Sequence, residues 1–126
     1  MTNPMMELSR ALDEAFCSDP RGSAVPGILE AYTREHTDWE PYRYFVEGRY
    51  TRSLVRRTED YELLLLCWGA GEESPIHNHM GQRCWMSVVE GEVEEVHFKR
   101  REDGPGPLIE GPTKRFKKGQ AAFIQD

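Results

Sequence analysis

The sequence lacks any long apolar run. The run LLLLCW at residues 63–68 is far shorter than the roughly 20 residues that a membrane-spanning helix needs. The N-terminus lacks the basic-then-apolar pattern of a secretory signal. The three cysteines are odd in number and form no CxxC pair, which argues against a disulfide framework. These absences predict a cytoplasmic protein with no membrane partner.

Positive charge is also scarce. The chain carries 16 Lys and Arg residues against 22 Asp and Glu residues, for a net charge of -6, and this balance disfavours a nucleic-acid partner. Basic residues cluster at 99–101 and 114–118, where solvated strand edges are the simplest interpretation. A length of 126 residues predicts one domain, 1–126, with a single core.

Residues 1–41 are predicted to form a helical N-terminal segment. Asn3-Pro4 can cap and start a first helix, and Asp19-Pro20 can stop it. The apolar positions of two stripes have helical spacing: Leu8, Ala11, Leu12, Ala15 and Phe16 in the first, and Val25, Ile28, Leu29 and Tyr32 in the second.

Residues 42–126 are predicted to be the β portion of the domain. Two strands, 50–55 and 61–68, are joined by a polar turn, and the apolar run within the second suits a strand that is buried on both faces. Further strands are expected at CWMSVVE, EVEEVHFKR and QAAFI, with the Gly- and Pro-rich residues 101–112 as a connection. Closely spaced strands with tight turns predict a mainly β protein, an antiparallel sandwich or barrel.

Two histidines, His77 and His79, follow a Gly/Pro-containing loop and precede a β run. On a strand, residues i and i+2 point the same way, so both imidazoles could bind one metal ion. Imidazole ligands suit Fe, Zn, Cu or Ni, and the alternative is two polar residues on a solvent-facing strand. His97 is interpreted as a strand-surface histidine.

Tyr50 and Arg52 alternate on one predicted strand and therefore share a face. A guanidinium beside a phenol suits a carboxylate, because it offers charge-assisted bonds and a neutral donor. The alternative is an exposed arginine, as we expect for Arg56 and Arg57.

Each cysteine can be interpreted as a packing residue instead of a residue of the functional site. Free cysteine is usually a small buried hydrophobe, and we assign Cys17 and Cys67 to packing. Cys84 has the same alternative, but its position five residues after His79 favours a place in the site.

The spacing of Gly71, His77, His79 and Gly91 resembles the first motif of the cupin superfamily. Cys84 stands where many cupins carry a ligating glutamate. Together with YTRSLV at residues 50–55 and LLCWG at 65–69, it makes residues 28–126 resemble the thiol dioxygenase branch, specifically the cysteine dioxygenase family.

The resemblance implies a cupin-type jelly roll preceded by two short helices, and a dioxygenase that uses ferrous iron, Fe(2+). L-cysteine and O2 would be its substrates and cysteine sulfinic acid its product. His77 and His79 would bind iron, and Arg52 with Tyr50 would hold the substrate carboxylate. Cys84 would form a thioether bond with a tyrosine.

The same resemblance implies that the chain is the N-terminal portion of a longer enzyme, truncated before the second cupin motif supplies its histidine. We therefore expect these residues alone to be inactive, to bind iron weakly and to self-associate, whereas the full-length enzyme is expected to be a monomer. Two alternatives stay open: a dioxygenase for 3-mercaptopropionate or another small thiol, and a non-enzymatic cupin binding module or pseudoenzyme.

Overall fold

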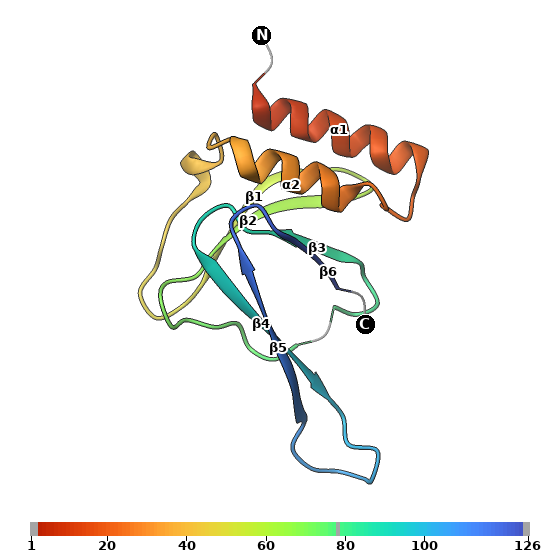
Figure 1. Cartoon of the computed structure of the whole chain (residues 1–126), viewed down its shortest axis with the longest axis vertical. Coiled ribbons are helices and arrows are strands. Elements are labelled where there is room, and N and C mark those ends of the chain that lie inside the picture. The colour runs from red at the N-terminus through yellow and green to blue at the C-terminus, as the bar shows by residue number, and fades with distance from the viewer. Residues whose placement is uncertain (1–2, 78, 125–126) are drawn as a thin grey trace.

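A computed structural model describes residues 3–77 and 79–124 (Figure 1). Helices lead the chain and antiparallel strands follow, so the mainly β, cupin-like architecture preceded by two helices is confirmed; the described strands do not close into a barrel. The elements are α1 (Pro4–Ser18), α2 (Val25–Glu35), a short 3-10 turn η1 (Glu40–Tyr42), β1 (Thr51–Arg57), β2 (Glu62–Cys67), β3 (Cys84–Ser87), β4 (Glu92–Lys99), β5 (Ile109–Lys117) and β6 (Ala121–Ile124).

The described strands form antiparallel pairs, β1 with β2, β3 with β6, and β4 with β5. The first and last of these are hairpins, and the β4–β5 hairpin lies in sequence between the two strands of the β3–β6 pair. In Figure 1 the two helices lie across one end of the strands, and the β4–β5 ribbon extends away from them. No helix in the described ranges is long and apolar enough to cross a membrane.

Helix α1 begins and ends where the sequence predicts. The Asn3 side chain accepts a hydrogen bond from the Met6 N–H at 2.9 Å, and Asp19 is the C-cap, so both ends are specified locally. Asp38 adds a distant support. Its carboxylate accepts the Met5 N–H at 2.8 Å and the Tyr32 hydroxyl at 2.5 Å, which ties the start of α1 to α2.

The core lies beneath the helices. Its buried members are Leu8, Leu12, Val25, Tyr32 and Trp39. Half-buried side chains pack against them, among them Leu63, Leu65 and Trp85 of the strands and Tyr61, which directly precedes β2. Burial of apolar area of this kind is the main favourable term in folding.

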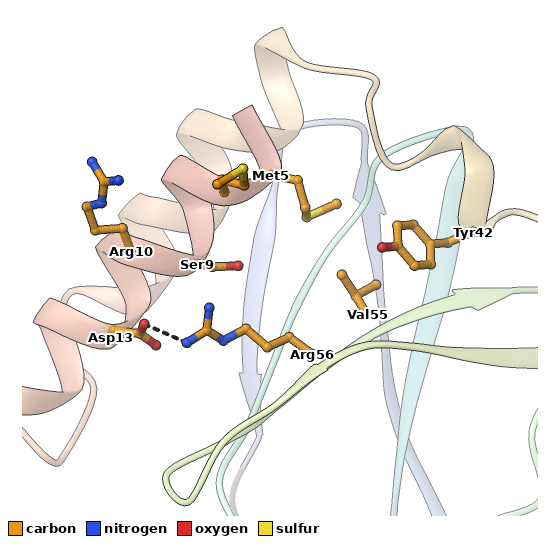
Figure 2. Close-up of a pocket in the computed structure, with 8 residues that line it drawn as sticks. Met5, Ser9, Arg10, Asp13, Tyr42, Val55 and Arg56 are labelled. Carbon is orange, nitrogen blue, oxygen red and sulfur yellow. Dashed lines mark hydrogen bonds and ion pairs between the residues drawn. The ribbon is translucent and has the colours of Figure 1, made fainter. Parts of the chain in front are cut away.

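Polar contacts join each helix to a different strand pair. Arg56 on β1 donates to Asp13 of α1 at 2.7 Å, and the Tyr61 hydroxyl donates to the other oxygen of Asp13 at 2.7 Å. Figure 2 shows the Arg56 side chain reaching α1. Arg56 and Asp13 both line a surface groove with a volume of about 350 Å³. On α2, the hydroxyls of Thr33 and Ser87 lie 2.9 Å apart, where the helix packs on β3 and β6.

Three local expectations are wrong. The leucines of the apolar run in β2, residues 63–66, are half-buried rather than buried on both faces. Cys17 is exposed, whereas Cys67 is buried as predicted. The Gly- and Pro-rich connection ends before Ile109, because residues 109–112 already belong to β5, where Ile109 and Glu110 pair with β4.

Candidate active site

The loop after β2 is shaped by its glycines and by Glu72. The Glu72 carboxylate accepts the Gly69 N–H at 2.6 Å, and a Cβ at position 69 would overlap the same oxygen. Gly71 has a φ of +77°, in the region that favours glycine. The backbone of the turn therefore favours glycine at position 71, whereas a Cβ at position 69 would displace the far end of the Glu72 side chain.

His77 and His79 lie on this loop, and their ring centroids are 5.0 Å apart. The expectation that a strand runs through both histidines is wrong: β3 begins only at Cys84, and Asn78, between the histidines, lies outside the described residues. Before β3, Met80 and Gly81 both have positive φ, 54° and 76°. The loop, rather than strand alternation, brings the two rings together.

The loop also orients the His77 ring. Its Nδ1 lies 2.7 Å from the Pro75 carbonyl oxygen, and a carbonyl only accepts, so Nδ1 carries the hydrogen. Nε2 then has a free lone pair, the state in which imidazole binds metals, and a carbonyl at the other nitrogen commonly fixes that tautomer. His77 is exposed and His79 is half-buried.

The two imidazoles fit a metal as part of a site. Neutral nitrogen donors suit divalent iron and its neighbours, but the residues that the structure describes include no group of three His, Cys, Asp or Glu side chains placed to hold an ion. His97 is an exposed residue of β4, and its Nε2 lies 2.6 Å from Glu95 Oε1. Further donors would have to come from water, substrate or another residue.

Arg52 and Tyr50 lie at the start of the β1–β2 hairpin. Tyr50 directly precedes β1, and its ring stacks on Trp68, with centroids 5.3 Å apart and planes at 18°. Arg52 is exposed and pairs across the hairpin with Leu66. The stack restricts the phenol, and the arginine keeps its donors available for an anion.

Cys84 is the half-buried first residue of β3. Burial raises the pKa of its thiol, and the negative charge of Glu95 raises it further, while the positive charge of Arg52 lowers it. The thiol is therefore held in its neutral form. Side chains of β1 and β4 thus act on one sulfur of β3.

Glu95 is the residue that sequence reasoning missed. Its side chain is 14% exposed, although strand carboxylates usually face solvent. The segment EVEEVHF contains a weak signal, since Glu95 falls on the same face as Val93 when side chains alternate.

Two helices over antiparallel strand pairs, with a histidine pair on a glycine-shaped loop, define a cupin-like protein. The family described as cysteine dioxygenase type I matches residues 5–126. Cysteine dioxygenase type 1 of Homo sapiens is 31% identical over 124 residues, and that of Rattus norvegicus is 32% identical over 124 residues. Each alignment covers 97% of this chain and 62% of the relative. The Danio rerio protein is 30% identical over 127 residues, which cover 95% of this chain and 61% of the relative.

The chain therefore belongs to the cysteine dioxygenase type I family. It spans about three fifths of the length of these curated relatives.

Proposed function

We propose that the protein containing these residues is an iron-dependent thiol dioxygenase that converts L-cysteine and O2 to cysteine sulfinic acid. Both oxygen atoms enter the product, and the thiolate sulfur is the atom oxidised. The observation that carries the proposal is the pair of adjacent imidazoles, His77 and His79, with ring centroids 5.0 Å apart. Family membership supports the same reaction.

In this proposal His77 and His79 hold the iron. When bound, ferrous iron supplies a Lewis acid that favours the thiolate form of the substrate and offers a position for O2. The Pro75 carbonyl, by keeping the hydrogen on His77 Nδ1, presents Nε2 to the metal before it arrives.

Arg52 and Tyr50 orient the substrate. The guanidinium pairs with the carboxylate of cysteine, and the phenol, stacked on Trp68, donates a hydrogen bond to it. Fixing the carboxylate places the sulfur and restricts its motion, which lowers the entropic part of the barrier. Cys84 is proposed to form the family's thioether with a tyrosine, which makes it a shaping group of the pocket and not a nucleophile.

Oxygen consumption tests the reaction. The natural protein, prepared without O2 and supplied with ferrous iron, should take up O2 on addition of L-cysteine and release sulfinate. Loss of a hydrogen bond to a charged group costs about 1.5–3 kcal/mol, so Arg52→Ala should lower kcat/KM for cysteine roughly 10- to 150-fold. Arg57→Ala, which removes an exposed arginine paired with Glu62, is the matched control. Equal losses in the two variants would contradict the role of Arg52.

Metal analysis tests the ligands separately. His77→Ala and His79→Ala should each abolish iron retention, because each removes a protein donor, whereas His97→Ala should retain iron. Undiminished iron in either of the first two variants would refute the assignment.

A non-enzymatic cupin module is the second candidate, and one observation favours it: the described residues offer no third protein ligand. A binding module would bind cysteine without consuming O2. The oxygen measurement above therefore separates the two candidates.

A further inference from the structure

A surface cavity of about 280 Å³ lies where α2 meets β5 and the start of β6. Two arginines from different elements line it together with an amide, a carboxylate and two apolar side chains. These residues are Arg34 and Glu30 of α2, Arg115 and Phe116 of β5, Gln120, which directly precedes β6, and Ala121. Segments far apart in the sequence therefore bring two guanidinium groups to one cavity.

The Arg34 side chain is held at both of its ends. Its Nη2 pairs with Glu30 Oε2, one turn earlier in α2, at 2.8 Å. Its aliphatic stem crosses the backbone at Gly119, where an added Cβ would lie 2.6 Å from Arg34 Cγ. Gly119 has a φ of +86°, a conformation that favours glycine, and the missing Cβ permits the close approach. A side chain that is already positioned loses less conformational freedom when it binds a ligand.

The polar groups at the cavity are mainly hydrogen-bond donors. Arg115 pairs with Glu94 through Nη2 at 2.9 Å, and Arg34 also pairs through Nη2, but each guanidinium carries five N–H groups. The Gln120 side chain accepts the Lys117 N–H with Oε1 at 2.7 Å. That bond directs the amide oxygen to the backbone and leaves the two N–H groups of the amide nitrogen as donors. Three side chains thus offer donors to one ligand.

Charge and size narrow the class of ligand. Two arginines and one glutamate give the lining a formal charge of +1, and the apolar walls that Phe116 and Ala121 supply strengthen electrostatic interactions nearby. A volume of about 280 Å³ is slightly below the roughly 300–1,000 Å³ of typical small-molecule sites, which favours a compact anion. Arginine binds phosphate through paired N–H bonds, and a tetrahedral phosphate presents oxygens in several directions, whereas a carboxylate has only two.

We propose that this cavity binds a phosphate group, with Arg34, Arg115 and Gln120 as its donors. The ligand connects α2 to β5 and to the start of β6, and it stabilises the protein because the donors are brought together only in the folded state. The proposed metal ligands and the proposed carboxylate-binding residues are not among the described residues that line the cavity. The proposal therefore does not depend on the proposed reaction.

Calorimetric titration of the natural protein with inorganic phosphate, at an ionic strength held constant with chloride, tests the site. Arg34→Gln and Arg115→Gln should each raise Kd about 10- to 150-fold, the loss expected for one hydrogen bond to a charged group. Arg57→Gln removes an exposed arginine that is paired with Glu62 and should leave Kd unchanged. Absence of phosphate binding by the wild type, or equal weakening in all three variants, overturns the proposal.

Gln120→Glu keeps the proposal testable if an arginine variant does not fold. It retains an oxygen that can accept the Lys117 N–H and replaces the donor nitrogen with a negatively charged acceptor. The variant should keep the circular dichroism spectrum of the wild type and lose phosphate binding. Undiminished binding in folded Gln120→Glu overturns the proposal.

Two further comparisons locate the anion and define its class. Arg52→Gln and His77→Ala change the candidate active site and should leave phosphate binding unchanged, so loss of binding in either variant would place the anion there and overturn the proposal. Acetate should bind much more weakly than phosphate, and equal binding of the two overturns the assignment to phosphate. Titration with glycerol 3-phosphate distinguishes the two sources of the group: binding shows that the cavity admits a phosphate ester, and binding of inorganic phosphate alone shows a site for the free anion. Both results support the site.

Discussion

The helix-covered side of the molecule and the candidate site differ in how completely their groups are satisfied. Beneath the helices, Leu12 is 3% and Trp39 is 5% exposed, and the carboxylate of Asp38 has a donor on each oxygen. At the site, Arg52 is exposed and Glu95 has a buried oxygen without a partner among the described residues. The packed and satisfied groups that stabilise the fold lie beneath the helices. The polar groups that could still bind a ligand lie at the candidate site.

The largest effect on stability is expected from a substitution in the core beneath the helices. Leu12→Ala should lower the free energy of unfolding by about 2–5 kcal/mol, because it removes buried methyl groups and leaves a cavity. Leu54→Ala is the control, since Leu54 lies on β1 and is 46% exposed. Urea denaturation measures both, and similar losses would show that the core is not where the structure places it.

The turn between the helices gives the next largest effect. Gly22 has a φ of +73°, and a Cβ there would lie 2.7 Å from the Trp85 ring, so Gly22→Ala should cost roughly 2–4 kcal/mol through strain and overlap. Gly27 lies inside α2 with no atom within 4 Å of an added Cβ. Gly27→Ala should therefore stabilise by about 0.5–1 kcal/mol. Thermal unfolding should show a lower midpoint temperature than wild type for Gly22→Ala and a higher one for Gly27→Ala.

The contact of Tyr61 with Asp13 should contribute less. Tyr61→Phe removes its hydrogen bond and should cost about 1 kcal/mol at pH 7, whereas Tyr44→Phe, at a residue 48% exposed, should cost little. Burial and the Asp13 carboxylate raise the pKa of Tyr61. Above pH ~10 the unfolded tyrosine loses a proton that the folded one keeps, so stability falls as pH rises. The difference in unfolding free energy between wild type and Tyr61→Phe should therefore become smaller as the pH rises above ~10.

The smallest expected effect is a change in the rate at which the cysteine thiols are alkylated, with little change in stability. Cys17 is exposed and Cys84 is half-buried, and the thiolate is the reactive form. Iodoacetamide at pH 8 should modify Cys17 faster than Cys84. Because Glu95 raises the pKa of Cys84, Glu95→Gln should accelerate labelling of Cys84 and leave Cys17 unaffected. Peptide mass mapping over time measures labelling at both cysteines. An unchanged labelling rate of Cys84 in Glu95→Gln would show that Glu95 does not influence the Cys84 thiol.

The elements that the sequence predicts well have local causes. Helix α1 is specified by Asn3, Pro4 and Asp19 at its ends, and each acts within a few residues of itself. The β1–β2 hairpin follows from two apolar runs around a polar turn, closed by the Thr58 N–H bond to the Tyr61 carbonyl at 2.9 Å. Neither feature requires knowledge of distant parts of the chain.

The features that the sequence does not predict depend on packing between distant segments. The run in β2 has the composition of a fully buried strand, but what covers its second face is decided elsewhere in the chain. The predicted strand through His77 and His79 fails because Met80 and Gly81 turn the backbone before β3. Burial of Glu95 results from the positions of several strands at once, which no local pattern encodes. The roles of His77, His79, Arg52, Tyr50 and Cys84 stay predictions.

The attachment of α2 to β3 and β6 also bears on protein synthesis. Roughly 85 residues separate the end of α2 from β6, so at about 5–20 residues per second the ribosome needs on the order of 4–17 s to make the second partner after the first. Early in that interval β1 and β2 can already pack on the helices, but Ser87 of β3, the partner of Thr33, has not yet been made, and β6 follows only later. The nascent chain therefore passes several seconds with part of its helical face uncovered, a period in which a chaperone has access to it.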